Sequence, residues 1–178
     1  MKMTAGKFDL IRSKHLLREA EGYLELGLAQ QALETLERLP DPYCDNPVAL
    51  LLRAEALREL ERYEEALGVF QRLEELDPDD VRVYLAKGWC HKRVGRIDLA
   101  CADLEKAAEL EPDNPLVCYN LACYYSLAGN KDKALSLLKK ALTLEPDYRK
   151  LVPAETDFDP IRSDPEFNRL LEAAGETA

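Results

Sequence analysis

Several signatures of catalytic and cofactor sites are missing from this sequence. It contains no CxxC pair, no glycine-rich phosphate loop, and no HExxH or GxSxG motif. Zinc ribbons, nucleotide-binding loops, metalloproteases and serine hydrolases depend on these patterns. The sequence therefore predicts a protein that is not an enzyme and that binds no metal and no cofactor.

Long apolar runs are also missing. Residues 1–10 lack the apolar stretch of a secretory signal, and no later segment approaches the roughly 20 apolar residues of a membrane span. The five cysteines are an odd number, which does not suit a disulfide framework. We therefore expect free thiols, no membrane association and a cytoplasmic location.

Positive charge is scarce overall but unevenly distributed. The formal net charge is -10, with 18 acidic and 10 basic residues in 1–80, 9 and 12 in 81–150, and 7 and 2 in 151–178. Binding to nucleic acid requires many lysine or arginine contacts to phosphate, so the composition argues against a nucleic-acid partner. A mildly basic middle lies between acidic ends.

What the sequence does contain is a repeat rich in helix-forming residues. Small residues, bends and prolines recur every 34 residues. The alanines are Ala32, Ala66, Ala100 and Ala134; the small residues of the preceding helices are Ala20, Ala54, Gly88 and Ala122; the bends are Gly27, Glu61, Gly95 and Gly129; the closing prolines are Pro78, Pro112 and Pro146. Small residues let two antiparallel helices approach closely, so each unit is expected to be a helical hairpin.

This 34-residue pattern resembles the tetratricopeptide repeat, most fully in the fourth unit with Leu121, Ala122, Tyr125, Gly129, Ala134, Ala141 and Pro146. The resemblance implies an all-α fold, a right-handed superhelical stack of four hairpins over residues 1–147 with a long first helix. The expected units are 12–45, 46–79, 80–113 and 114–147, followed by a carboxyl-terminal helical cap over 148–178. The run DFDPIRSDPEF resembles a segment that closes such repeats in bacterial proteins, which favours a bacterial source.

The connections and ends carry their own signals. Pro40 ends the second helix of the first unit early, and Asn46 before Pro47 is a predicted helix cap. Ser163 with Glu166 suggests a capping box for a last helix. That helix would use its apolar stripe to seal the fourth repeat; the stripe is Phe167, Leu170 and Leu171.

In this family the first helices of the hairpins line a concave groove, and the resemblance transfers those positions to this chain. The candidate peptide-binding residues are Lys14, Glu21, Glu55, Arg58, Arg82, Leu85, Trp89, Lys92, Arg93, Tyr119, Asn120 and Cys123. The same faces include Leu17, Leu24, Glu25, Val48, Leu51, Glu59, Leu116, Ser126 and Leu127. A clamp for chaperone tails is largely missing, because only Asn120 matches its lysine and asparagine positions.

The leading functional hypothesis is a scaffold or adaptor that binds a partner peptide or helix in this groove. The basic cluster around Trp89 would suit acidic residues beside an apolar side chain. Trp89 itself has two open interpretations, an exposed anchor or a packing residue. His91 is expected in the core, at the position of Tyr23 and Tyr125. The alternatives are a self-assembling homo-oligomeric element and, more remotely, a thiol redox sensor using Cys118 or Cys123.

Overall fold

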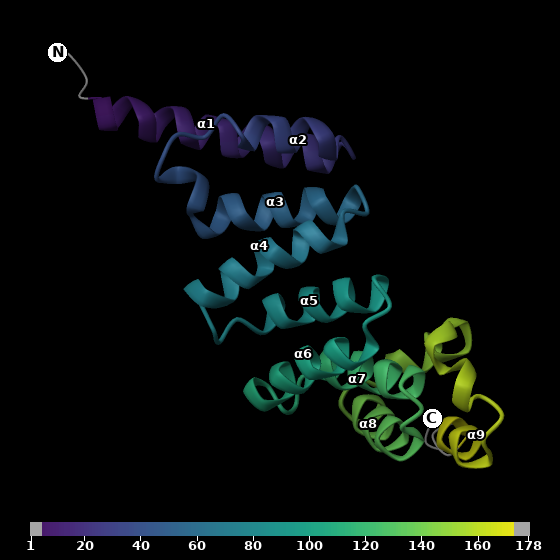
Figure 1. Cartoon of the computed structure of the whole chain (residues 1–178). Coiled ribbons are helices and arrows are strands. Elements are labelled where there is room, and N and C mark those ends of the chain that lie inside the picture. Colours follow the sequence, from purple (N-terminus) through teal and green to yellow (C-terminus); the bar gives the residue numbers. More distant parts are fainter. Residues whose placement is uncertain (1–4, 173–178) are drawn as a thin grey trace. The chain divides into compact units, whose positions relative to one another are not determined.

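The computed structural model describes residues 5–172, and every regular element among them is a helix. The predicted all-α class is thus confirmed for the described chain, whereas part of the expected cap, residues 173–178, lies outside it. Nine α-helices follow one another in this range (Figure 1). They are α1 (Ala5–Glu25), α2 (Ala29–Leu36), α3 (Pro47–Glu59), α4 (Tyr63–Leu76), α5 (Val81–Arg93), α6 (Ile97–Leu110), α7 (Pro115–Leu127), α8 (Lys131–Leu144) and α9 (Pro165–Glu172).

The helices belong to two compact units, residues 1–83 and 84–178, which we describe separately. In the first unit, α1 packs on α2 and α3 packs on α4, while α1 and α2 also contact α3. In the second unit, α7 packs on α8 and α6, and α9 lies against α8. Sequential helices therefore form hairpins, as the repeat predicts.

Four tight bends end the first helices of the hairpins. Gly27, Gly95 and Gly129 have φ of 69°, 77° and 75°, and Glu61 occupies the same left-handed region with φ of 57°. At each bend the following N–H group bonds back to a carbonyl of the preceding helix at 2.8–2.9 Å, as in Arg62 to Leu57. This is the Schellman arrangement that glycine favours, so the predicted bend positions are confirmed, and Glu61 carries a strain that the three glycines avoid.

Close packing within the hairpins explains the small residues. Gly88 of α5 approaches α6 so closely that an added Cβ would collide with the Leu104 side chain and lie 3.3 Å from the Ala100 carbonyl oxygen. The alanines Ala20, Ala32, Ala54 and Ala66 are fully buried. Larger side chains would push the paired helices apart.

The connectors agree in part with the sequence. The Asn46 side chain accepts a hydrogen bond from the Ala49 N–H at 3.0 Å, which confirms the predicted cap of α3. The predicted Ser163–Glu166 capping box is wrong. Asp164 accepts the Glu166 N–H at 2.8 Å instead, because Pro165 is the first helical residue and its neighbour takes the cap position.

The segment between α8 and α9 consists of three short 3₁₀ helices, η2 (Pro146–Lys150), η3 (Val152–Ala154) and η4 (Thr156–Ile161). Val152 and Phe158 are completely buried, and η4 packs against α7. Phe167 of α9 is also buried, with Leu170 and Leu171 partly buried against the same core. The predicted stripe therefore does seal this end of the unit.

Candidate functional site

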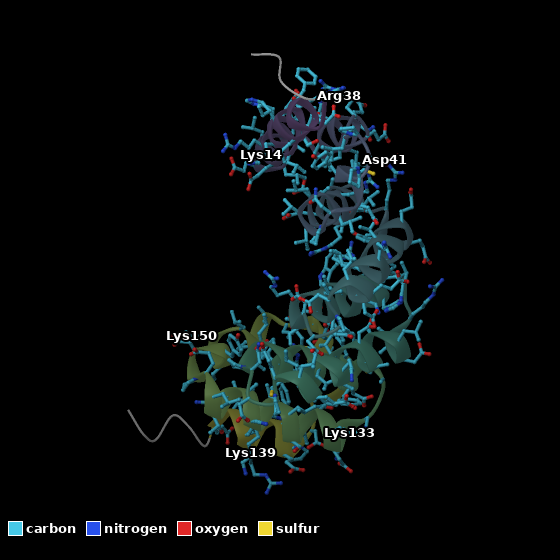
Figure 2. All side chains as sticks on the ribbon, turned by 90° about the vertical axis from the view of Figure 1, so that its left-hand side faces the viewer. Lys14, Arg38, Asp41, Lys133, Lys139 and Lys150 are labelled. Carbon is cyan, nitrogen blue, oxygen red and sulfur yellow. The ribbon has the colours of Figure 1, made fainter. Side chains whose placement is uncertain are left out.

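The candidate groove residues of the first unit lie on α1 and α3. Lys14, Glu21 and Glu55 are exposed and Arg58 is half-buried. Between Val48 and Glu59, α3 exposes only Val48, Leu51, Glu55 and Glu59, whose spacing of three and four places them on one helical face. In Figure 2, Lys14 lies on the opposite side of this unit from Asp41.

We call the face formed by these positions on the two neighbouring helices the acidic face. Its members are Lys14, Leu17, Glu21, Leu24 and Glu25 on α1 and Val48, Leu51, Glu55, Arg58 and Glu59 on α3. These members include four glutamates, two basic residues and four apolar side chains. The acidic face is therefore both negatively charged and partly apolar.

The third group of candidates lies on α5. Arg82 is exposed and its guanidinium pairs with Asp80 at 2.7 Å, which also lowers the pKa of that carboxyl through the hydrogen bond. Leu85 and Trp89 are half-buried, and the Arg93 guanidinium lies 5.6 Å from the centre of the Trp89 ring. Trp89 thus keeps some exposure and a cationic neighbour.

The candidates on α7 are mostly covered. Tyr119 is 5% exposed and Cys123 is 2% exposed, while Asn120 is half-buried. Tyr148 and Phe158 pack edge-on against the Tyr119 ring, with centroid distances of 5.1 and 5.7 Å. The expectation that Tyr119 and Cys123 line an open groove is wrong, because the chain's own segment 146–161 lies over them.

Lys92 participates in the same covering contact. Its ammonium group pairs with the Asp157 carboxylate and lies 5.7 Å from the centre of the Tyr124 ring. Figure 2 shows Lys150 of this segment and Lys133 of α8 on opposite sides of the second unit. Asp157 followed by Phe158 is an acidic residue beside an apolar side chain, the chemistry expected of a partner, yet here it belongs to the same chain.

A thiol and two carboxylates meet beneath this segment. The ligand atoms of Cys123, Glu155 and Asp157 lie within 4.8 Å of one another. Local structure already uses both carboxylates, since Asp157 pairs with Lys92 and Glu155 accepts the Asp157 N–H at 3.2 Å. Burial, reinforced by the nearby carboxylates, raises the pKa of the Cys123 thiol well above its ordinary value. We assign this cluster to packing and capping.

The other thiols have similar surroundings. Cys118 is 1% exposed, and burial raises the pKa of its thiol. Reactive cysteines have lowered pKa values and solvent access. The structure therefore gives no support to a redox role for Cys118 or Cys123.

One polar cluster was not predicted from the sequence. His91 Nδ1 lies 2.5 Å from Asp103 Oδ2, and Lys87 Nζ lies 3.2 Å from Asp103 Oδ1. Lys87 and Asp103 are each 8% exposed, and the neighbouring Cys90 is completely buried. The cluster ties α5 to α6, and it places no accessible nucleophile beside His91. The sequence did contain a signal for this cluster. Lys87 and His91 lie four residues apart on one helix, and Asp103 lies on the helix that packs closely against Gly88.

Comparison with known proteins agrees with this architecture. Family profiles described as tetratricopeptide repeat match residues 47–90, 81–114 and 115–148, together more than half of the chain. The chain belongs to the tetratricopeptide repeat family. As a tetratricopeptide repeat protein it is a helical-repeat module of the protein-interaction and scaffold type.

Solved structures of MamA share the fold. MamA residues 41 to the end from Desulfovibrio magneticus RS-1 has a TM-score of 0.73 at 20% identity, covering 94% of this chain and 98% of that one. A MamA structure labelled AMB-1 has a TM-score of 0.71 at 24% identity, covering 94% of both chains. Another MamA crystal structure has a TM-score of 0.70 at 23% identity, covering 78% of this chain and 81% of that one. No curated protein matches the sequence.

Proposed function

We propose that this tetratricopeptide repeat protein is a scaffold that binds a segment of a partner protein, and that the acidic face on α1 and α3 is the principal binding surface. The observation that carries the proposal is an uncovered stripe of apolar side chains. Val48 is 55% exposed and Leu51 is 37% exposed, on the helix face that the family uses for binding. Exposed apolar groups arranged in a stripe favour a role in recognition.

The difference between α3 and α7 supports this choice of surface. On α7 the equivalent positions Tyr119 and Cys123 are buried under residues 146–161. A partner would have to displace a tethered segment there, at a high effective concentration. The acidic face has no such covering among the described residues, so binding at α1 and α3 needs no displacement.

The proposal retains a smaller role for α5. Arg93 beside Trp89 supports contact with a partner residue that is acidic and lies next to an apolar side chain. The contribution of Arg82 is reduced by its pairing with Asp80, and that of Lys92 by its pairing with Asp157. Leu85 and Asn120, which belong to the second unit, are half-buried and offer little contact area.

A capture experiment tests the proposal. Wild-type protein is compared with Val48→Ser/Leu51→Ser and with Leu76→Ser, which changes an exposed apolar residue of α4 outside the acidic face. Partner proteins should be retained by wild type and Leu76→Ser and lost from the double variant. Equal capture by the folded double variant would refute binding at this surface.

Self-assembly is the second candidate, and one observation favours it. Phe8 is 58% exposed and Ile11 is 41% exposed on the amino-terminal half of α1, which is far longer than its partner α2. A second copy could cover these side chains. Light scattering would show a concentration-dependent increase in mass, abolished in Phe8→Ser, whereas a constant monomer mass would eliminate this candidate.

We also propose that the protein acts in a bacterial cytoplasm. The support is the closing segment near residues 157–167 and the five cysteines, all free thiols in the structure. No described helix combines the length and apolarity needed to cross a membrane. Cell fractionation with a tagged chain tests the location.

A further inference from the structure

The glutamates of the acidic face occupy the carboxyl-terminal halves of their helices. α1 ends at Glu25 and α3 ends at Glu59, and in each helix a second glutamate lies four residues earlier, at Glu21 and Glu55. All four side chains are exposed. Two helix ends that belong to neighbouring helices thus present four carboxylates on one face.

This arrangement is unfavourable for the helices themselves. Carboxylates near a helix carboxyl terminus oppose the negative end of the helix dipole, and like charges four residues apart repel each other. α5 shows the favourable alternative, because its last turn carries His91, Lys92 and Arg93, whereas the last turn of α3 carries only Arg58 and that of α1 carries no basic residue. The glutamates of α1 and α3 therefore stand where helix stability alone would select basic residues.

These four carboxylates outnumber the two basic residues of the same face, Lys14 and Arg58. Within residues 5–172, the structure gives Glu21, Glu25, Glu55 and Glu59 no ion pair and no side-chain hydrogen bond. Glu19, on another side of α1, does find a partner in Arg38 at 3.6 Å. A negative potential thus remains at the carboxyl-terminal side of the acidic face, available to a ligand.

Apolar side chains adjoin the carboxylates. Val48 precedes Glu55 by two helical turns and Leu51 precedes it by one, and Leu17 precedes Glu21 by one turn. Leu17 and Leu24 are half-buried, so they form a shallow floor and not a deep pocket. The surface is apolar toward one end and acidic toward the other.

We propose that the acidic face binds a basic amphipathic segment of a partner protein, whose apolar residues cover Val48 and Leu51 and whose lysines or arginines face the four glutamates. This inference rests on the proposed function and specifies the partner. Phosphate-rich ligands and anionic lipid headgroups would be repelled by the same carboxylates. Charges steer the partner, and the buried apolar residues hold it.

Fluorescence anisotropy with synthetic peptides tests the inference on the full chain. The first probe is a labelled amphipathic peptide of leucine, alanine and lysine with helical spacing, and the second replaces each lysine with glutamate. Wild type should bind the lysine probe and not the glutamate probe, and affinity should fall as salt is raised. Equal binding of both probes, or none of the lysine probe, overturns the inference.

Two variants with the same change in net charge distinguish a local effect of the acidic face from an effect of the protein's overall charge. Glu21→Gln/Glu55→Gln should weaken lysine-probe binding about fivefold or more, and the loss of repulsion should leave its thermal stability equal or higher. Glu34→Gln/Glu37→Gln changes an exposed acid of α2 and the exposed acid at its carboxyl-terminal cap, both outside the acidic face, and should bind like wild type. Unchanged binding by Glu21→Gln/Glu55→Gln, or an equal loss in the α2 variant, contradicts the assignment.

The apolar variant distinguishes this inference from the function on which it rests. If partner capture depends on Val48 and Leu51 but the lysine probe fails to bind, the scaffold function is supported and the preference for a basic partner is refuted. If Val48→Ser/Leu51→Ser captures partners as wild type does, both the binding surface and the preference for a basic partner are refuted. A mass that rises with protein concentration in light scattering, and that falls back to the monomer value when the lysine probe is added, would identify a second copy as the occupant and overturn the assignment to a different protein.

Discussion

Replacing Asp157 with asparagine should loosen the segment that covers α7. The substitution removes the carboxylate that pairs with Lys92 and leaves Phe158 in place. The Lys92 side chain is 27% exposed and the Asp157 side chain 10%, so Lys92 can be partly hydrated once its partner is lost. We therefore expect a cost of about 1–2 kcal/mol, which corresponds to roughly a 5- to 30-fold increase in local opening.

The Cys123 thiol reports this opening, because it is 2% exposed beneath the segment. Peptide-resolved mass spectrometry after alkylation should show faster labelling of Cys123 in Asp157→Asn by the same factor. Cys118, buried on the same helix, should keep its slow rate if the opening is local. The control is Asp147→Asn, which removes an ion pair with Lys150 whose side chains are 79% and 75% exposed.

Unchanged Cys123 labelling in Asp157→Asn would show that Lys92 and Asp157 do not hold the segment. Equal acceleration of Cys118 and Cys123 would show that the whole unit unfolds instead. Either result would refute the reasoning that residues 146–161 form a separable cover.

Three further predictions concern the stability of the fold. Glu61→Gly should raise the free energy of unfolding by about 1 kcal/mol in urea denaturation, because glycine accepts the φ of 57° without strain; a decrease would contradict the strained bend. Gly88→Ala should lower it by about 1–3 kcal/mol through collision with Leu104, and an unchanged midpoint would mean that α6 yields freely. Burial raises the pKa of the Cys101 thiol to about 11, so the contribution of the neutral thiol to stability is lost as pH rises through about 11. The free energy of unfolding of Cys101→Ala should therefore fall less steeply with alkaline pH than that of wild type. Parallel curves of unfolding free energy against pH would contradict this.

The repeating part of the fold was predictable from the sequence, because its determinants are local and recur. Positions such as Gly27 and Gly95 need a left-handed backbone, and Gly88 needs a missing side chain. Each requirement is met within one hairpin, so the 34-residue spacing reveals it. Even Glu61 follows the backbone of its glycine counterparts despite its side chain.

The covered part of the site was not predictable in the same way. Tyr119 and Cys123 occupy groove positions by spacing, but their accessibility depends on Tyr148 and Phe158, which lie outside the repeat. The pairing of Lys92 with Asp157 joins residues 65 positions apart. A repeat pattern carries no information on where a non-repeating segment folds back.

The paired polar residues inside the third hairpin illustrate an intermediate case. His91 was expected in the core, and the structure places it half-buried between α5 and α6. Its partner Asp103 lies twelve residues away on the next helix, at a position that the family pattern does not mark. Only the hairpin geometry brings the two side chains together.

Hydrogen exchange of the chain alone and in complex with a captured partner tests the central claim most directly. The account predicts new protection concentrated in residues 14–25 and 48–59, the two segments that form the acidic face. Protection confined to α2 and α4, with those two segments unchanged, would contradict it.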